Sequence, residues 1–249
     1  MTSIKQIKKE TVKEVDAILS NSGARLEEMS NILKIHFSST KLSEIGATYE
    51  SAIASQPEGK NTSLAPAVES YLDIISSTID EMQTLDRYIM LHTPQMEDGN
   101  NFGVTVQMMV SKALTDSREK MAKLLATVPT YHSARADAID KLGLQKVVTS
   151  VTKTESASTS TGGADGDEKK GSTSNVEEEK TVGSAGIEER MTLRLVHVAS
   201  LDVQFYFQLR SGLLDCRDTY LMILDNVEKN KAKLTSPKGS GGSNSMGMY

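Results

Sequence analysis

Long stretches of this chain repeat their apolar residues every three or four positions, and this spacing constrains the fold more than any other feature. In the first stretch, from about residue 3 to residue 37, the positions that follow it are Ile4, Ile7, Val12, Val15, Ile18, Leu19, Leu26, Met29, Ile32 and Leu33. Residues with this spacing share one face of an α-helix, so the stretch predicts a long amphipathic helix. A shorter amphipathic piece follows over residues 42–54, and the first helical region therefore covers residues 3–54.

Two further regions show the same helical character. The second covers residues 66–92, where Pro66 suits the first turn of a helix and Pro94 lies just beyond its end. The third covers residues 103–148, and Pro129 inside it predicts a kink.

The fourth region, residues 187–233, is the longest. At 1.5 Å per residue it would extend for about 70 Å if unbroken, and we expect a bend at Ser211-Gly212. Its apolar side chains exceed what one helix face can hold; they include Leu193, Leu195, Val196, Val198, Phe205, Tyr206 and Phe207. Because one core uses roughly a third of a helix surface, the excess predicts either an oligomer interface or a central helix wrapped on all sides.

The composition fits an all-α protein. Trp is absent, aromatic residues make up 4%, and Met occurs 12 times, whereas strands favour aromatic and β-branched residues. The hydrophobic fraction of 38% supports a folded core. Four helical regions joined by turns and loops predict an up-down-up-down four-helix bundle, in a single domain over residues 1–249.

The composition changes sharply over residues 150–186, which are Ser, Thr, Gly, Asp, Glu and Lys with almost no apolar residues. Such a segment buries too little apolar surface to offset the entropy of ordering, so we expect a disordered insert. In the alternating topology, this insert and the loop around Pro57 lie at one end of the bundle. The N-terminus, the turn between the second and third regions, and the C-terminus then lie together at the other end.

Charge and cysteine usage exclude several classes of protein. A net charge of −5 argues against a general nucleic-acid binder, and no apolar run approaches the roughly 20 residues of a membrane span. The N-terminus is polar and charged, which does not suit a secretory signal, and the single cysteine, Cys216, excludes an intramolecular disulfide. We therefore expect a cytoplasmic or nuclear protein without nucleic-acid or membrane partners.

No catalytic or metal-binding constellation is evident, so the sequence predicts neither an enzyme nor a cofactor. The four histidines are His36, His92, His132 and His197. None of them forms the Glu-x-x-His or His-x-x-x-His pair that a metal site in a helical bundle needs. No glycine-rich phosphate loop lies between a strand and a helix, and Cys216 reads as a small buried or interfacial residue.

A cluster of permissive residues lies between the second and third regions: Glu97, Asp98, Gly99, Asn100, Asn101, Phe102 and Gly103. Its glycines and asparagines tolerate positive φ and suit a tightly shaped turn. Glu97 and Asp98 precede a helix, where acidic side chains favour the positive end of the dipole. A plain connector between helices and a contact loop both fit this cluster, and Phe102 favours the contact loop because an aromatic ring must pack somewhere.

The C-terminal tail, residues 236–249, is Gly/Ser-rich until its last four residues, Met246, Gly247, Met248 and Tyr249. An expression scar or a frayed end is one interpretation. The other is a flexible tether whose terminal carboxylate and Tyr249 ring enter a pocket of a partner. Several such tails on one ring would gain affinity by avidity.

Both elements resemble those of the 11S (REG-type) proteasome activators. The family carries Pro-Arg-Ile-Glu-Asp-Gly-Asn-Asn-Phe-Gly-Val as its activation loop, and residues 94–104 match it with Gln95 and Met96 in place of Arg and Ile. Val106-Gln107 continues the match. Three other segments also look like family segments: Lys41-Leu42-Ser43-Glu44-Ile45, Ser236-Pro237-Lys238-Gly239 and Met246 to Tyr249.

The resemblance implies a homoheptameric ring of four-helix bundles that caps the 20S proteasome, without ATP and without chemistry of its own. The tails would dock in pockets of the proteasome α-ring, with Tyr249 foremost. The activation loops would open the substrate gate, with Asn100 foremost and Gly99, Asn101 and Phe102 next. The alternative from another class is a helical scaffold or lipid-surface protein without proteasome contact.

The sequence departs from the family pattern in three places. The long charged insert lies between the third and fourth regions, whereas some family members carry one between the first and second. Gln95 removes a positive charge beside the loop, and the ending Met-Gly-Met-Tyr is looser than the usual family ending. The role of the insert and the strength of docking therefore do not follow from the resemblance.

Overall fold

A computed structural model describes residues 3–55, 61–95, 101–142 and 184–238, with only the backbone described for residue 54 and residues 184–191. The helices in these ranges are α1 (Ile4–His36), α2 (Leu42–Ser55), α3 (Ala65–His92), α4 (Phe102–Leu125), α5 (Thr127–Asp140) and α6 (Ser184–Thr235). The described ranges contain no strand, and the expectation of an all-α fold is confirmed.

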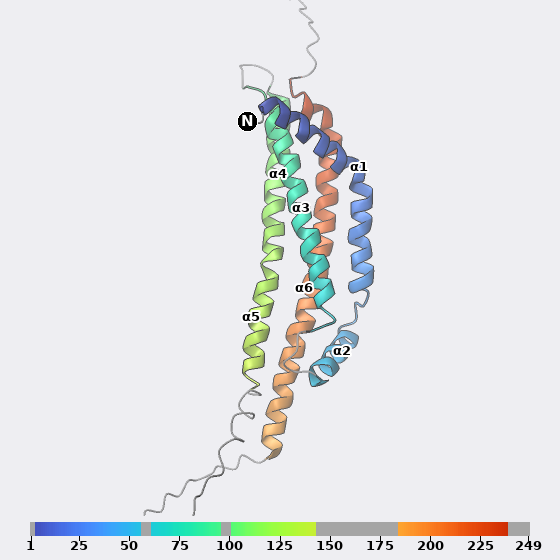
Figure 1. Ribbon diagram of the computed structural model, residues 1–249, viewed down its shortest axis with the longest axis vertical. Helices are drawn as coiled ribbons and strands as arrows, with labels where there is room; N and C mark the ends of the chain where they lie inside the picture. The colour runs from blue at the N-terminus through green and yellow to red at the C-terminus, as the bar shows by residue number, and fades with distance from the viewer. Residues whose placement is uncertain (1–2, 56–60, 96–100, 143–183, 239–249) are drawn as a thin grey trace, which may run out of the picture.

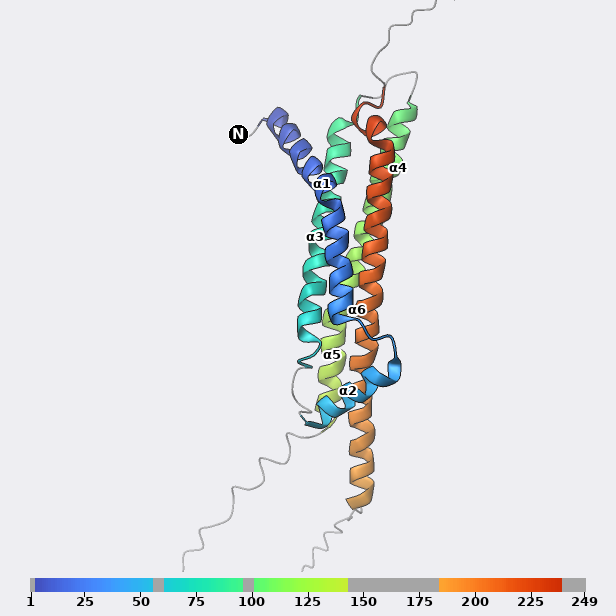
Figure 2. The same ribbon diagram turned by 90° about the vertical axis from the view of Figure 1, so that its right-hand side faces the viewer.

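The long helices lie lengthwise beside one another, whereas the short α2 lies obliquely near one end (Figures 1 and 2). The chain runs down through α1, up through α3, down through α4 and α5, and up through α6. At one end, which we call the loop end, α3 and α6 finish and α4 begins; the opposite end, with α2, the end of α5 and the start of α6, is the far end. Each of the other helices contacts α6, which is therefore the central element of the bundle.

The core forms where the apolar faces of the helices meet around α6. Its large, fully buried side chains include Met29, Tyr71, Ile75, Met82, Leu114, Met121, Leu209, Leu213 and Tyr220. Burying a side chain of this size stabilises the fold by about 1.5–3 kcal/mol. The three- and four-residue spacing of the sequence thus places its apolar face against the neighbouring helices, as in other amphipathic bundles.

The first two turns of α1 depart from this pattern. Ile4 and Ile7 belong to the apolar face that the sequence defines, yet they are 70% and 39% exposed, and burial begins only at Thr11 and Val15. Figure 2 shows the reason: the start of α1 leans away from the other helices. The helical spacing thus continues beyond the point where a partner helix is present.

Pro129 divides the predicted third region into two helices. α4 ends at Leu125 and α5 begins at Thr127, with the break at Ala126. Proline lacks the N–H that would bond the carbonyl four residues earlier, and its ring crowds that carbonyl, here that of Leu125. Residues 143–148 of the predicted region lie outside the described residues, and so do residues 150–183 of the predicted insert. Residues 184–186, which the sequence assigns to the insert, form the start of α6.

No break occurs in α6 at Ser211-Gly212, where the sequence predicts a bend. Gly212 instead permits a close approach of α3, because a Cβ there would lie 2.5 Å from the Tyr71 hydroxyl oxygen. Tyr71 is completely buried and its hydroxyl donates to the carbonyl oxygen of Leu124 at 3.4 Å. The glycine therefore serves helix packing at this point.

The sequence predicts either an oligomer interface or a fully wrapped central helix for the excess apolar side chains of α6, and the structure shows both buried and exposed ones. Phe205 stacks on Tyr131 with ring centroids 3.7 Å apart, and Tyr206 packs against Phe37 at 5.3 Å. These rings are wrapped by neighbouring helices, as expected of a central helix. Leu193 and Val196, however, remain exposed, so part of the excess is still available to a partner.

Candidate functional site

The candidate site is the loop end of the bundle, where both segments singled out in the sequence are attached. Glu97, Asp98, Gly99 and Asn100 of the loop, and Met246, Gly247, Met248 and Tyr249 of the tail, lie outside the described residues. The structure does describe Asn101, Phe102 and Gly103 and the tail up to Lys238. We call the bases of the two segments, residues 88–95, 101–107 and 233–238, the junction.

The first side of the junction is the end of α3. The Thr93 hydroxyl donates to the carbonyl oxygen of Ile89 at 3.0 Å, and Nδ1 of His92 lies 2.8 Å from the carbonyl oxygen of Tyr88. The last four carbonyls of a helix lack intrahelical partners, and the Thr93 hydroxyl supplies one to Ile89. Pro94 follows, and because a residue before proline avoids the helical region, α3 ends at His92.

The second side is the start of α4, where Asn101 occupies the cap position. Its φ is −98°, so the backbone does not use the tolerance of asparagine for positive φ. Its side chain makes no capping hydrogen bond. Its carbonyl oxygen instead accepts bonds from the Thr105 N–H at 3.0 Å and from the Thr105 hydroxyl at 3.2 Å.

Gly103 brings the tail against the loop. A Cβ at Gly103 would lie 2.6 Å from the Cα of Pro237, closer than any side chain allows, and Pro237 itself is buried. The sequence interprets this glycine as a site of positive φ, but it lies within the first turn of α4. Its absent side chain is required because the backbone of the tail passes directly beside it.

Phe102 lies at the edge of the same junction and is 66% exposed. The Nζ atom of Lys233 lies 5.8 Å from the centroid of its ring, a cation–π contact that contributes about 0.5–1 kcal/mol at an exposed site. The expectation that the ring must pack is therefore met only in part. Most of its surface is available to a partner of the loop.

Gln107 joins all three helices of the junction. It is 1% exposed, and its Nε2 donates to the carbonyl oxygen of Leu234 at 2.8 Å and to that of His92 at 3.2 Å. Sequence reasoning used Gln107 only as a continuation of the family match. A signal for it exists, because Gln107 is a polar residue on the face that also carries the buried Val104, Val110 and Leu114.

Two further contacts hold the end of α6 in place. The hydroxyl oxygens of Tyr88 and Thr235 are 3.0 Å apart, which joins the last turns of α3 and α6. Leu234, which precedes Thr235 in α6, is also buried. The junction therefore joins the ends of α3 and α6 to the start of α4, and among its described side-chain atoms only Oε1 of Gln107 is buried without a hydrogen-bond partner.

A cleft of about 470 Å³ lies beside the junction, between α3 and α4. Ile89 and Gln107 line it, and Met90 and Met108 on its edge are largely exposed. Methionine is unbranched and polarizable, and it suits surfaces that adapt to a partner. The loop end thus presents apolar surface beside the attachment points of the loop and the tail.

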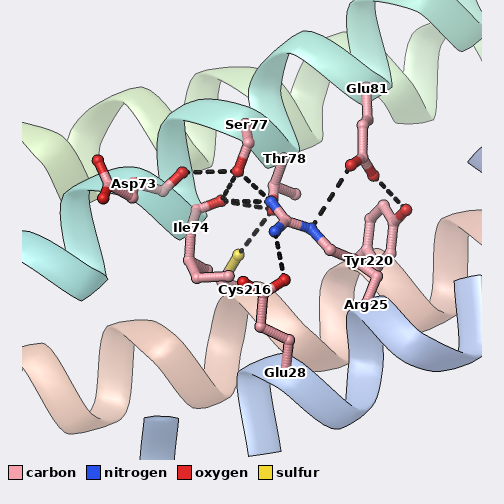
Figure 3. A network of polar contacts seen from close by, with 9 residues as sticks. All are labelled: Arg25, Glu28, Asp73, Ile74, Ser77, Thr78, Glu81, Cys216 and Tyr220. Atoms are coloured by element: carbon pink, nitrogen blue, oxygen red, sulfur yellow. Dashed lines mark hydrogen bonds and ion pairs between the residues drawn. The ribbon is translucent and has the colours of Figure 1, made fainter. Parts of the chain in front are cut away.

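Polar clusters elsewhere fasten the helices together. Figure 3 shows Arg25 of α1, which lies 3.5 Å from Glu81 of α3, donates to Ser77 and pairs with Glu28 at 2.7 Å. Tyr220 of α6 donates to Glu81, and burial together with this bond raises the pKa of the Tyr220 hydroxyl far above its usual value. This network links α1, α3 and α6 in the middle of the bundle.

A second cluster fastens the far end. Asp202 of α6 is completely buried and accepts from Nε of Arg135 at 2.9 Å, from the Tyr131 hydroxyl at 2.7 Å and from Nδ2 of Asn61 at 2.8 Å. A buried carboxylate is stable only when it is paired and hydrogen-bonded in this way. The cluster joins α5, α6 and the segment before α3, and it lies away from the loop end.

Nothing in the described ranges has the form of an active site. No group of three His, Cys, Asp or Glu residues there could hold a metal ion. Cys216 is buried, as the sequence suggests, and burial raises the pKa of its thiol to about 11, so it is not a thiolate nucleophile at neutral pH. Within the same ranges, no helix has both the length and the apolar character that a bilayer crossing requires.

Comparison with known proteins identifies the class of this fold. The sequence model of the family "Proteasome activator PA28, C-terminal" matches residues 59–154. Proteasome activator complex subunit 3 of Homo sapiens and that of Gallus gallus are each 22% identical over 180 residues, which cover 72% of this chain. The matched part is 54% of those relatives, so the chain spans about half the length of the curated relatives it matches.

Solved structures share the whole arrangement of helices. The 11S subunit of the Plasmodium falciparum proteasome, PA28, superposes with a TM-score of 0.63 at 18% identity, over 94% of this chain and 92% of that one. The 11S activator in a proteasome–11S activator complex gives 0.60 at 15% identity, over 93% and 92%. At these identities the likeness demonstrates the fold.

The helical bundle, with a loop connection and a tail attached at one end, has the fold of an 11S activator subunit. The family match, the curated relatives and the solved structures together support the 11S (REG-type) proteasome activator family for this chain. The resemblance that the loop and tail motifs indicate is thereby confirmed.

Proposed function

We propose that this chain is an ATP-independent activator that caps the 20S proteasome. Its tail, through Met246 to Tyr249, docks on the α-ring, and its activation loop, Glu97 to Gly103, opens the substrate gate. The observation that carries the proposal is the junction, in which Gln107 and the contact of Gly103 with Pro237 hold the bases of both segments together. A loop and a tail that leave from one small surface act on one partner.

The acting form is a homoheptameric ring, as the family resemblance implies. Support comes from the outer surface of α6, where Leu193, Val196, Leu221 and Met222 are exposed. A monomer would leave this apolar surface in water, whereas a neighbouring subunit would cover it. A ring also presents several tails at once, so that weak single contacts add to a tight one by avidity. The working compartment is the cytoplasm, the nucleus or both.

Activation in this scheme requires no bond-making by the activator. The tails supply the binding free energy, and the loops use the resulting proximity to hold the gate in its open arrangement. A ligand shifts an equilibrium by its differential affinity for the two states, so the ring must bind the open gate more tightly than the closed one. ATP is not needed because the binding free energy drives the shift.

The direct test combines purified chain with purified 20S core and a fluorogenic peptide, without ATP. We expect the rate of peptide hydrolysis to rise with activator concentration and to saturate. A chain that lacks residues 246–249 is the matched control, since it removes only the tail end. Correctly assembled rings that leave the rate unchanged would reject the proposal.

The alternative, a scaffold or lipid-surface protein, predicts different measurements. Native mass spectrometry should give a ring of about seven subunits for an activator of this family, and flotation with anionic vesicles should recover none of it. A chain that floats with the vesicles and fails to stimulate the core would favour the alternative.

A further inference from the structure

The side chain of Gln107 closes the base of the connection between α3 and α4. Gln107 lies in the second turn of α4, and its Nε2 donates to the carbonyl oxygen of His92, the last residue of α3, at 3.2 Å. The two residues are 15 positions apart and lie on either side of the activation loop. One hydrogen bond therefore fixes the distance between the two ends of the loop.

The same amide nitrogen fastens this base to α6. It also donates to the carbonyl oxygen of Leu234 at 2.8 Å, one residue before the end of α6. Carbonyls in the last turns of α3 and α6 have no intrahelical partner, so each needs an external donor. A glutamine amide carries two N–H groups and can serve both, whereas glutamate, methionine and leucine cannot.

We propose that Gln107 is a positioning residue of the activation loop: it holds the two ends of the loop against the last turn of α6. This inference rests on the proposed function. A loop that opens a gate must keep its position when the gate pushes back, so its base must be rigid. Docking relies instead on a Gly/Ser-rich tail that adapts to small shifts of its attachment point. Gln107 therefore acts on gate opening and leaves docking unchanged.

The first test replaces Gln107 by methionine, which keeps the length of the side chain and removes both donors. Stimulation of peptide hydrolysis by 20S core is measured against activator concentration, after assembly has been checked by native mass. We expect the maximal stimulation to fall by about fivefold or more, since one buried and one partly buried hydrogen bond are lost. The half-saturating concentration should stay within about twofold of the unmodified chain, because docking is intact.

The second test replaces Gln107 by glutamate and measures how stimulation depends on pH. A general loss of stability would not give the pH dependence expected below. A carboxylate facing two carbonyl oxygens cannot donate, but a protonated carboxyl can donate to one of them. Burial beside two acceptors favours the protonated form and raises the carboxyl pKa. Stimulation relative to the unmodified chain at the same pH should therefore recover as the pH is lowered from about 8 to about 6.

Two further variants separate positioning from general stability. Gly103→Ala disturbs the junction from the other side, because its Cβ would displace Pro237, and it should reproduce the effect of Gln107→Met. Tyr131→Phe removes a buried hydrogen bond of 2.7 Å to Asp202 at the far end. As the matched control, it should keep the maximal stimulation of the unmodified chain.

The proposal is overturned by any of three results. Gln107→Met could stimulate like the unmodified chain, its half-saturating concentration could rise in proportion to the lost stimulation, or Tyr131→Phe could lose as much. If Gln107→Met does not assemble, Gly103→Ala and the pH dependence of Gln107→Glu decide in its place. Absence of stimulation by the unmodified chain is a separate outcome, which rejects the proposed function itself.

Discussion

Gly103 and Gly212 occupy points where two segments come too close for a side chain. The backbone of Pro237 passes Gly103, and the Tyr71 ring fills the space beside Gly212. Neither requirement can be read from local sequence, because each neighbour is far away in the chain. The sequence interprets one glycine as a turn residue and the other as a bend, and tertiary packing gives both a different role.

At Gly212, an alanine should destabilise the fold. Its Cβ would lie 2.5 Å from the Tyr71 hydroxyl oxygen, and overpacking of this kind costs about 1–3 kcal/mol, of which better helix propensity returns about 1 kcal/mol. Denaturant unfolding should therefore give a lower midpoint. In a Tyr71→Phe background the same change should cost less, and an equal cost would show that the hydroxyl is not the obstacle.

Burial of Cys216 makes stability depend on pH. Its thiol pKa rises from 9.0 to about 11 in the folded protein because burial disfavours the thiolate. The unfolded thiol ionises first, so this stabilisation is complete below about pH 9 and is lost as the pH rises through about 11, by about 2–3 kcal/mol in total. Urea unfolding between these pH values should show the loss, and Cys216→Ala should make the slope shallower. An unchanged slope would assign the effect to the buried tyrosines.

At the scale of elements, sequence periodicity predicts most of the helices, and Pro129 predicts a kink in the third region, where the structure has two separate helices. α3 begins at Ala65 and ends at His92, against an expected 66–92. Periodicity did not predict that the start of α1 is exposed or that α6 is one continuous helix. Spacing reveals which face of a helix is apolar, but not whether another helix is present to cover it.

Asn100 belongs to the segment that we propose as the activation loop, Glu97 to Gly103. We expect Asn100→Tyr to keep docking and to lose gate opening, because a large ring at the loop tip would prevent the contact that the gate requires. Co-sedimentation with 20S core should be unchanged while peptide hydrolysis returns to the rate of the core alone. Loss of both together would mean that the loop only contributes to docking.

At the scale of the whole molecule, the alternating directions of the helices bring the loop and the tail to one end. The far end carries α2 and the Asp202 cluster, and it lies away from the junction. The two ends of the molecule therefore differ, and the predicted contact surface lies at one end only. In a ring of parallel subunits, this difference between the ends would place all loops and tails on the same side.

Deletion of Met246 to Tyr249 should abolish co-sedimentation with the core. In the proposed ring, each tail would bind weakly by itself and several tails would multiply their effect, so the loss of all of them should remove the avidity. Assembly should be unaffected, because the deletion lies beyond α6. Full binding by the shortened chain would refute the anchoring role of the tail.

The sequence by itself determined the all-α class, the course of most helices and the resemblance of the loop and tail to a known family. Those properties follow from local spacing and from short motifs, which need no knowledge of distant contacts. Only the tertiary structure decided that Gln107 joins α3 to α6, and that Gly103 makes room for Pro237. Both are contacts between segments far apart in the chain, and such contacts exist only once the helices have packed.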